Sequence, residues 1–185
     1  MKPTLTGELV VLRPIRADDS DAMWEMVTDP EGSRLTGRNR TSTREEIDDW
    51  CAKAGTEEGR IDWAITHGSD EYLGEIVLNR IDAYHGSASL RLALRPGQRG
   101  RGFGGEAMQL ALAHAFDEAG LGLHRVYLEV LSTNPRARIL YEHLGFVAEG
   151  RLRDSHRNGE FWCDSIVMSM LEDDHAAAQA ARADR

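Results

Sequence analysis

The sequence predicts an α+β domain with a mixed, mainly antiparallel sheet and one crossover helix. Three observations support this fold class. Six to seven short stretches have the apolar pattern of strands, and about four have helical periodicity. A glycine-rich turn joins an alternating stretch to a long helical stretch, which predicts the crossover. No repeat or low-complexity linker divides the chain, so we expect one domain over residues 1–172 and a flexible or frayed tail over 173–185.

Local signals place the elements in chain order. Strands are expected at residues 9–15, 61–65, 72–78, 87–94, 125–131, 146–152 and 161–170. Helices are expected at about residues 17–28, 43–54, from the glycine-rich turn to 119, and from 134 to 144. Hairpin turns are expected at residues 68–70 and 158–159, and a loop from residue 29 to residue 43.

The composition, with 41% hydrophobic and 29% charged residues, is typical of a globular protein. The formal net charge of −9 argues against a general nucleic-acid binder and favours attraction of cationic small molecules. The first eight residues lack a signal-peptide core, and no apolar run is long enough to span a membrane, so we expect a cytoplasmic protein without a membrane partner. Cys51 and Cys163 lack the spacing of a disulfide framework or of a metal site.

The glycine-rich turn over residues 95–107 has the composition of an anion-binding site. Its glycines allow positive φ angles, and the first N–H groups of the following helix point outward with the positive end of the helix dipole. Arginine side chains add forked donors that suit phosphate oxygens. We therefore expect a pyrophosphate here, and the expected binding residues are Arg99, Gly100, Arg101, Gly102, Phe103 and Gly104.

Two other interpretations of this turn stay open. Residues 100–105 also satisfy the dinucleotide pattern G-x-G-x-x-G, and Glu129 lies on the next strand, where a ribose-binding acid would stand. Against this, residues 95–99 separate the glycines from the preceding strand, and the pattern comes only after about half of the chain. The other alternative is a glycine-rich turn with solvated arginines.

One strand later, residues 134–146 form a second motif. Together the two motifs resemble the GNAT family of N-acetyltransferases. The first matches its acyl-CoA signature, Q/R-x-x-G-x-G/A, at Arg99, Gly102 and Gly104. The second matches its helix motif, N-x-x-A-x-x-x-Y-x-x-x-G-F, at Asn134, Ala137, Tyr141, Gly145 and Phe146. Residues 9–19 and 149–168 are similar to the RimJ/RimL-type branch of that family.

The resemblance implies a GNAT fold whose sheet is splayed between the fourth and fifth strands, residues 87–94 and 125–131, with acetyl-CoA in the gap. It also implies that the backbone of Leu92, Ala93 and Leu94 pairs with the pantetheine. An unpaired strand edge offers the N–H and C=O groups that such an arm needs, and one N–H could stabilise the thioester oxyanion. Asn134 is expected to contact the cofactor or to brace the splay.

The resemblance assigns two catalytic roles. Tyr141 is the expected general acid, which protonates the departing CoA thiolate, and a phenol stays protonated at neutral pH. Glu129 is the expected general base, which acts on the acceptor amine directly or through water. The alternative for Tyr141 is a packed side chain on an amphipathic helix, and for Glu129 a salt bridge to a neighbouring arginine. His124 and His143 are weaker candidates for such chemistry.

The acceptor site is less defined by the sequence. The loop with Arg34, Arg38 and Arg40 is where the family forms part of this site, so these arginines either meet an acceptor carboxylate or are solvated. Aromatic side chains that could line the site, with core packing as the alternative, are Trp24, Phe161 and Trp162.

The sequence thus predicts an N-acetyltransferase that moves the acetyl group of acetyl-CoA to a primary amine by direct attack in a ternary complex. The acceptor is expected to be a protein N-terminus or a small-molecule amine, and the apolar last strand could support a homodimer. The alternatives are a non-catalytic acyl-CoA-binding or sensing module, a transferase that uses another acyl donor, and, more distantly, a dinucleotide-dependent oxidoreductase.

Overall fold

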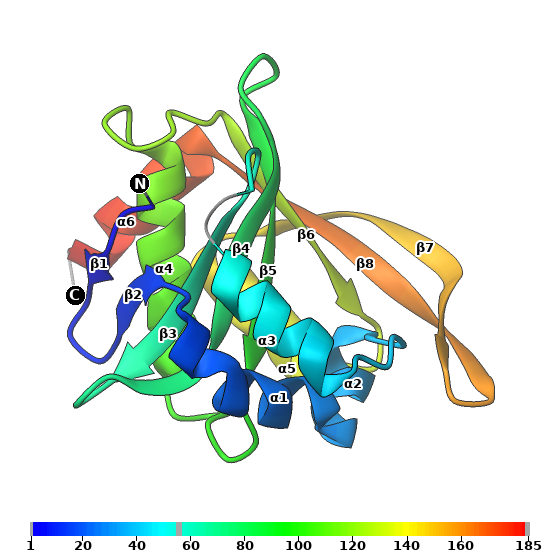
Figure 1. Cartoon of the computed structure of the whole chain (residues 1–185). Helices are drawn as coiled ribbons and strands as arrows, with labels where there is room; N and C mark the ends of the chain where they lie inside the picture. The colour runs from blue at the N-terminus through cyan, green and yellow to red at the C-terminus, as the bar shows by residue number, and fades with distance from the viewer. Residues whose placement is uncertain (1, 55–56, 184–185) are drawn as a thin grey trace. The chain divides into compact units, whose positions relative to one another are not determined.

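The computed structural model describes residues 2–54 and 57–183, and this part contains eight strands and six α-helices (Figure 1). The strands are β1 (Leu5–Thr6), β2 (Val11–Pro14), β3 (Ile61–His67), β4 (Glu71–Asp82), β5 (Ser87–Leu94), β6 (Arg125–Leu131), β7 (Val147–Asn158) and β8 (Phe161–Leu171). The α-helices are α1 (Ser20–Thr28), α2 (Pro30–Thr36), α3 (Arg44–Lys53), α4 (Phe103–Phe116), α5 (Pro135–Leu144) and α6 (Glu172–Ala183), and one 3-10 turn, η1, spans Ala17–Asp19.

The strands form a mixed sheet in the order β1-β2-β3-β4-β5-β6-β8-β7. The pairs β1–β2, β2–β3, β3–β4, β6–β8 and β7–β8 are antiparallel, whereas β5 and β6 pair in parallel. The predicted α+β architecture with a mixed, mainly antiparallel sheet is therefore confirmed. The two strands expected on either side of the splay form the parallel pair, which ends at Ser89 and Tyr127.

The chain folds into two compact units that interleave along the sequence. Unit 1 falls within Met1–Asn79 and Arg91–Ala111, and unit 2 within Arg80–Leu90 and Leu112–Arg185. The boundaries cut through β4, β5 and α4, so three elements begin in one unit and end in the other. The expectation of a single domain over residues 1–172 stays a prediction.

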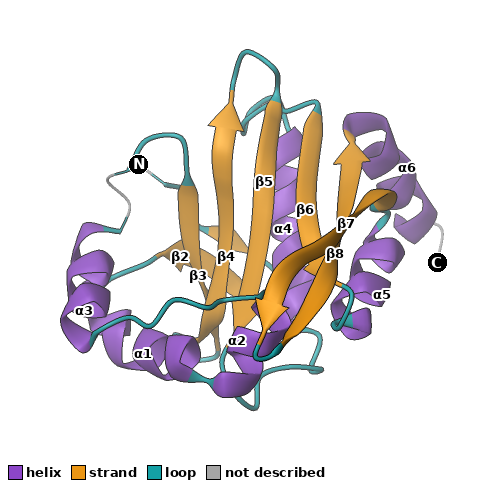
Figure 2. Ribbon diagram, turned by 90° about the vertical axis from the view of Figure 1, so that its right-hand side faces the viewer, coloured by secondary structure: helices purple, strands orange, loops and turns teal. Residues whose placement is uncertain are grey.

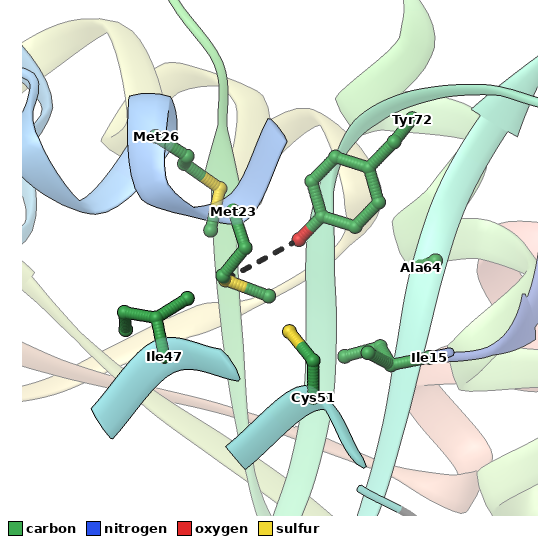
Figure 3. Close-up of a cluster of buried hydrophobic side chains, with 7 residues drawn as sticks. All are labelled: Ile15, Met23, Met26, Ile47, Cys51, Ala64 and Tyr72. Atoms are coloured by element: carbon green, nitrogen blue, oxygen red, sulfur yellow. Dashed lines mark hydrogen bonds between the residues drawn. The ribbon is translucent and has the colours of Figure 1, made fainter. Parts of the chain in front are cut away.

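In unit 1, the helices α1, α2 and α3 lie beside one another, and they are blue to cyan in Figure 1. A cluster of buried side chains joins α1 and α3 to β3 and β4, and Figure 3 shows its members: Ile15, Met23, Met26, Ile47, Cys51, Ala64 and Tyr72. The Tyr72 hydroxyl donates to the Met23 sulfur at 3.6 Å, so the one polar atom of this ring is satisfied within an apolar cluster. Burial raises the pKa of the Cys51 thiol to about 11, as expected for an unreactive structural cysteine.

A buried ion pair connects the end of β2 to η1. The Arg13 guanidinium donates from Nη1 and Nη2 to the two carboxylate oxygens of Asp19, at 2.8 and 2.7 Å. Both residues are about 5% exposed, and Arg13 Nε also donates to Asp70 at 2.6 Å. These contacts raise the pKa of Arg13, so its charge is permanent. Asp19 therefore holds the start of the first helical segment against β2.

The expected loop over residues 29–43 is wrong in its first half, because α2 occupies Pro30–Thr36. Asp29 accepts hydrogen bonds from the backbone N–H groups of Glu31 and Gly32, and proline stands in the first turn, where its missing N–H costs nothing. Gly37 ends the helix with a φ of 70°. The stretch from Asp29 to Ser33 begins a helix, although its proline and glycine predicted only a break.

Unit 2 is built on β6, β8 and β7, with α5 and α6 beside these strands (Figure 2). The inner side chains of the central strands are almost fully buried: Val126, Leu128, Met168 and Met170. β7 is irregular, with register shifts between Ala148 and Gly150 and between Leu152 and His156. These bulges determine which β7 side chains lie beside β8.

The predicted bounds of β5, β6 and α5 agree with the structure, whereas the predicted number of elements is too low. The expected six to seven strands become eight in the described residues, since β1 is a two-residue strand that pairs with β2. The expected four helices become six through α2 and α6. α6 lies in the expected tail, and how far it frays stays a prediction.

Candidate functional site

The glycine-rich loop of unit 1 has the backbone geometry that its sequence predicts. Gly97, Gly100 and Gly102 have φ angles of 75°, 78° and 89°, in the region that favours glycine. The Glu106 N–H donates to the Gly102 carbonyl at 3.2 Å, and α4 therefore begins directly after the last of these glycines. Three glycines, which have no side chains, thus precede the first turn of α4, where the backbone N–H groups have no partner within the helix. An anion can therefore approach these N–H groups closely.

Close packing fixes this loop against β5. A Cβ on Gly104 would lie 3.1 Å from Leu92 Cδ2 and 3.4 Å from Leu94 Cδ1, so glycine lets the first turn of α4 approach the strand. Ala93, between them, packs against the buried cluster of unit 1 instead. The three predicted pantetheine-binding residues are half-buried, and two of their side chains hold the start of α4.

The two arginines of the loop have different environments. The Arg99 guanidinium donates to Asp29 at 2.5 Å, to Glu31 at 2.7 Å and to the Leu94 carbonyl at 3.0 Å. Burial raises the pKa of Asp29, but hydrogen bonds from Arg99 and Gly32 outweigh it, and the net shift is downward. Arg101 is exposed, donates to Gln98 at 2.7 Å and lies over the Phe103 ring at 4.8 Å. Arg99 therefore ties the loop to the start of α2, while Arg101 presents its charge at the surface.

In unit 2, the second motif forms α5 and both of its ends. The Asn134 side chain accepts from the Ala137 N–H at 3.1 Å and caps the first turn, followed by Pro135. Gly145 ends the helix with a φ of 108°. The N–H groups of Gly145 and Phe146 then donate to the Tyr141 carbonyl, at 3.2 and 2.9 Å. The spacing of the motif is thus the spacing of a capped ten-residue helix.

Tyr141 is held by the turn that ends its own helix. Its ring lies 5.9 Å from that of Phe146, which the Gly145 turn brings back against it. The side chain is 9% exposed, and burial raises the pKa of Tyr141 to about 12. The phenol is therefore protonated throughout the neutral range, as a general acid must be.

Glu129 lies on β6 with its carboxylate exposed. The Ser165 hydroxyl on β8 donates to Glu129 Oε2 at 2.8 Å, and Ser165 itself is fully buried. Along β6, Val126, Leu128 and Val130 form a buried face, and Glu129 projects from the other. The partner of Glu129 is thus a serine, where the sequence suggested an arginine as the alternative to a catalytic role.

Comparison with known families gives a direct assignment, because the acetyltransferase (GNAT) domain family matches residues 10–147. The chain belongs to the GNAT family. The matched segment contains the glycine loop, β6 and α5 with Tyr141. The predicted RimJ/RimL-type resemblance and the assignment to the N-acetyltransferase enzymes are confirmed.

Individual relatives agree with this assignment. An uncharacterised N-acetyltransferase, p20 of Bacillus licheniformis, is 27% identical over 180 residues, which cover 94% of this chain and 98% of that protein. The spermidine N(1)-acetyltransferase of Vibrio cholerae is 34% identical over 90 residues, so the match spans about half of each chain. The solved spermidine N-acetyltransferase of Vibrio cholerae, in complex with CoA and spermine, has a TM-score of 0.84 at 23% identity and covers 92% of this chain and 99% of its own. That likeness establishes a shared GNAT fold.

The structure distributes the predicted GNAT site residues over both units. Leu92, Ala93, Leu94 and the loop Arg99–Gly104 belong to unit 1, where the loop packs on the end of β5. Glu129, Asn134 and Tyr141 belong to unit 2, where Asn134 caps α5 and Tyr141 lies within it. Their roles in binding and catalysis stay predictions. Within the described residues, none of the helices has the length and apolar character of a membrane-spanning helix.

Sequence analysis missed a second candidate for acid–base chemistry, Glu75 on β4. Glu75 lies opposite Ala64 in the β3–β4 strand pair. Its half-buried side chain therefore lies on the face of the sheet that α1 and α3 cover. Burial raises the pKa of Glu75, although the charge of Arg91 lowers it in part. The signal was a single carboxylate within the otherwise apolar strand of residues 72–78.

The expected acceptor-site arginines divide into three cases. Arg40 pairs with Glu46 at 3.0 Å, and Arg34 is exposed on α2. Arg38 donates to Ser42 at 2.6 Å, while its Nε is buried without a hydrogen-bond partner. Among the aromatic candidates, Trp24 packs against the buried cluster, but core packing is wrong for Phe161 and Trp162, which are 77% and 60% exposed.

Proposed function

We propose that this protein is an N-acetyltransferase that moves the acetyl group of acetyl-CoA to a primary amine. The observation that carries the proposal is the glycine loop: it matches the acyl-CoA signature, has three positive φ angles and leads directly into α4. A pyrophosphate would accept hydrogen bonds from the N–H groups of this loop, and Arg101 would add charge. The pantetheine would pair with the backbone of β5 over Leu92–Leu94.

In the proposed mechanism the amine attacks the thioester carbonyl directly in a ternary complex. Glu129 takes the proton from the amine, an N–H of β5 stabilises the oxyanion, and Tyr141 gives its proton to the CoA sulfur as the C–S bond breaks. The raised pKa of Tyr141 supports the last step, since the phenol reaches the reaction protonated. No step needs a metal ion.

The acceptor that we propose to test first is a polyamine. The Vibrio cholerae relative acts, by its name, on spermidine, and the net charge of −9 attracts polycations. A protein N-terminus is the second class to test, as the RimJ/RimL-type resemblance predicts. A cytoplasmic location and a homodimer remain predictions of the sequence.

The test is thiol release from acetyl-CoA with a panel of spermidine, spermine, aminoglycosides and N-terminal peptides, beside calorimetric titration with CoA. Release that depends on an amine supports the proposal. CoA binding without release from acetyl-CoA, succinyl-CoA or propionyl-CoA would favour a sensing module. Release from a longer or charged acyl-CoA alone would favour another donor. Absence of CoA binding would overturn the proposal.

Glu75 gives a specific reason to test a second base. A carboxylate with a raised pKa is a stronger base than an ordinary one, and Glu75 lies on β4, whose neighbour β5 is the proposed pantetheine strand. Glu129→Gln and Glu75→Gln therefore belong in the same assay. A fall in kcat of about 10²-fold or more identifies the base, and an unchanged KM for acetyl-CoA shows that the cofactor still binds.

A further inference from the structure

Behind Glu129, three side chains continue the hydrogen bond that it makes. Ser165 Oγ donates to Glu129 Oε2 at 2.8 Å, and Ser155 Oγ lies 3.2 Å from Ser165 Oγ. His156 Nδ1 lies 3.1 Å from Ser155 Oγ. Ser165 is fully buried, Ser155 is exposed and His156 is half-buried, so the contacts run from Glu129 on β6 across β8 to β7.

A bulge in β7 makes this arrangement possible. Leu152 pairs with Ser165 and His156 pairs with Cys163, so β7 holds three residues between these pairs where β8 holds one. Asp154, in the bulge, has a φ of 49°, and its N–H donates to Asp164 Oδ1 at 2.7 Å. Arg151 forms an ion pair with the same carboxylate. In a regular hairpin Ser155 would lie too far along β7 to contact Ser165. The contacts of Asp154 and Arg151 with the Asp164 carboxylate stabilise the bulge.

We propose that Ser165, Ser155 and His156 form a proton relay that returns Glu129 to its carboxylate form after each attack. The inference rests on the proposed role of Glu129 as the base. After Glu129 has taken the amine proton, the two hydroxyl groups turn so that each donates away from it. Glu129 gives its proton to Ser165 Oγ, Ser165 gives its own to Ser155 Oγ, and Ser155 gives its own to His156 Nδ1. His156 accepts at Nδ1 in its Nε2–H tautomer, and the imidazolium then loses the Nε2 proton to water. Before the next turnover, exchange with water puts a proton back on Nε2 and removes the one on Nδ1, which restores the accepting tautomer.

The relay conserves protons and restores the observed hydrogen bonds. After the transfer, Ser165 again donates to Glu129, and Ser155 again donates to Ser165. His156 Nδ1 then carries the hydrogen that it shares with Ser155. Ser165 and Ser155 are positioning residues in this scheme, since they act through Glu129. The Ser165–Glu129 contact at 2.8 Å has an ordinary hydrogen-bond length, and the other two, at 3.2 and 3.1 Å, must shorten during transfer.

The test compares Ser165→Ala, Ser155→Ala and His156→Ala in the thiol-release assay. Each should lower kcat by about 3- to 30-fold, less than loss of the base itself, with KM for acetyl-CoA unchanged. Free imidazole should restore kcat in His156→Ala, and Ser155→Thr, which keeps the hydroxyl, should behave as the wild type. A structural role would not respond to imidazole.

Ser169 provides the matched control. It lies on the same strand, is 4% exposed, and its hydroxyl donates to Glu149 at 2.8 Å, so Ser169→Ala removes an equivalent buried hydrogen bond without touching the relay. Equal losses of kcat in Ser169→Ala and Ser165→Ala would overturn the relay. Unchanged kcat in Ser155→Ala and His156→Ala, with Glu129→Gln slow, would also overturn it and leave the base in place. Unchanged kcat in Glu129→Gln would instead overturn the role of Glu129 in the proposed function.

Discussion

Tyr141 combines a buried ring with a raised pKa, and its substitution gives the first prediction. Tyr141→Phe keeps the packing against Phe146 but removes the proton that CoA sulfur would receive. A thiolate leaves readily, so kcat should fall by about 10²-fold without reaching zero. Thiol release at saturating acetyl-CoA measures this. In the wild type, any loss of rate from ionisation of Tyr141 should appear only as pH rises towards about 12. An unchanged kcat in Tyr141→Phe would return this side chain to a packing role.

Two aspartates at the start of the first helical segment give a second prediction at this scale. Asp19 pairs with Arg13 where both are buried, whereas Asp21 pairs with Arg44 while 90% exposed. Asp19→Ala leaves a buried guanidinium without its main partner and should cost about 3–5 kcal/mol. Asp21→Ala should cost at most about 1 kcal/mol. Urea unfolding of both variants decides this, and equal midpoints would contradict it.

The close approach of β4 to β5 gives a prediction at the scale of elements. A Cβ on Gly74 would lie 2.2 Å from the Ala93 carbonyl oxygen, a backbone atom that cannot turn away. Gly74→Ala should therefore destabilise the protein by about 3 kcal/mol or more and disturb the proposed pantetheine strand. The control is Gly150→Ala on β7, where nothing lies within 4 Å, and it should stay within about 0.5 kcal/mol of the wild type. Thermal unfolding and CoA affinity both report the difference.

The connection among β6, β7 and β8 gives a pH-dependent prediction. Arg125 and Ser169 donate to Glu149 and lower its pKa from about 4.5 to about 2. A lowered carboxylate pKa stabilises the folded state above the unfolded pKa, and this contribution disappears as pH falls from about 4.5 through about 2. The Tm difference between the wild type and Glu149→Gln should shrink across that window. Glu142→Gln, which removes an exposed ion pair within α5, is the control for the loss of a surface carboxylate.

Elements with strong end signals were predicted from sequence with their bounds, and elements defined by tertiary contacts were not. Asn134 and Gly145 mark both ends of α5 by local hydrogen bonds, so its sequence suffices. α2 was missed because proline and glycine occur in helix ends as well as in loops, and the capping role of Asp29 depends on its geometry. Ser165 and Ser155 were missed because a β-bulge sets their contact, and register is not visible in one strand alone.

The net charge of −9 acts at the scale of the whole molecule. It should speed the encounter with polycationic acceptors, an effect that salt screens. If a polyamine is the acceptor, kcat/KM for spermine should fall steeply between ~0.05 and ~0.5 M ionic strength, with kcat nearly constant. A monoamine acceptor should show a much weaker dependence. Equal slopes for both amines would mean that the global charge has no role in choosing the acceptor.

The order in which the two units alternate along the chain has a consequence for synthesis on the ribosome. Unit 1 needs residues 91–111 to be complete, and these follow a segment of unit 2, residues 80–90. An emerging chain of 79 residues therefore already exposes most of unit 1 but lacks the end of β5 and the start of α4. The strands and helices of unit 1 that emerge first cannot complete their packing until about residue 111 has left the exit tunnel. Pausing or chaperone contact over that interval should therefore change the yield of folded protein.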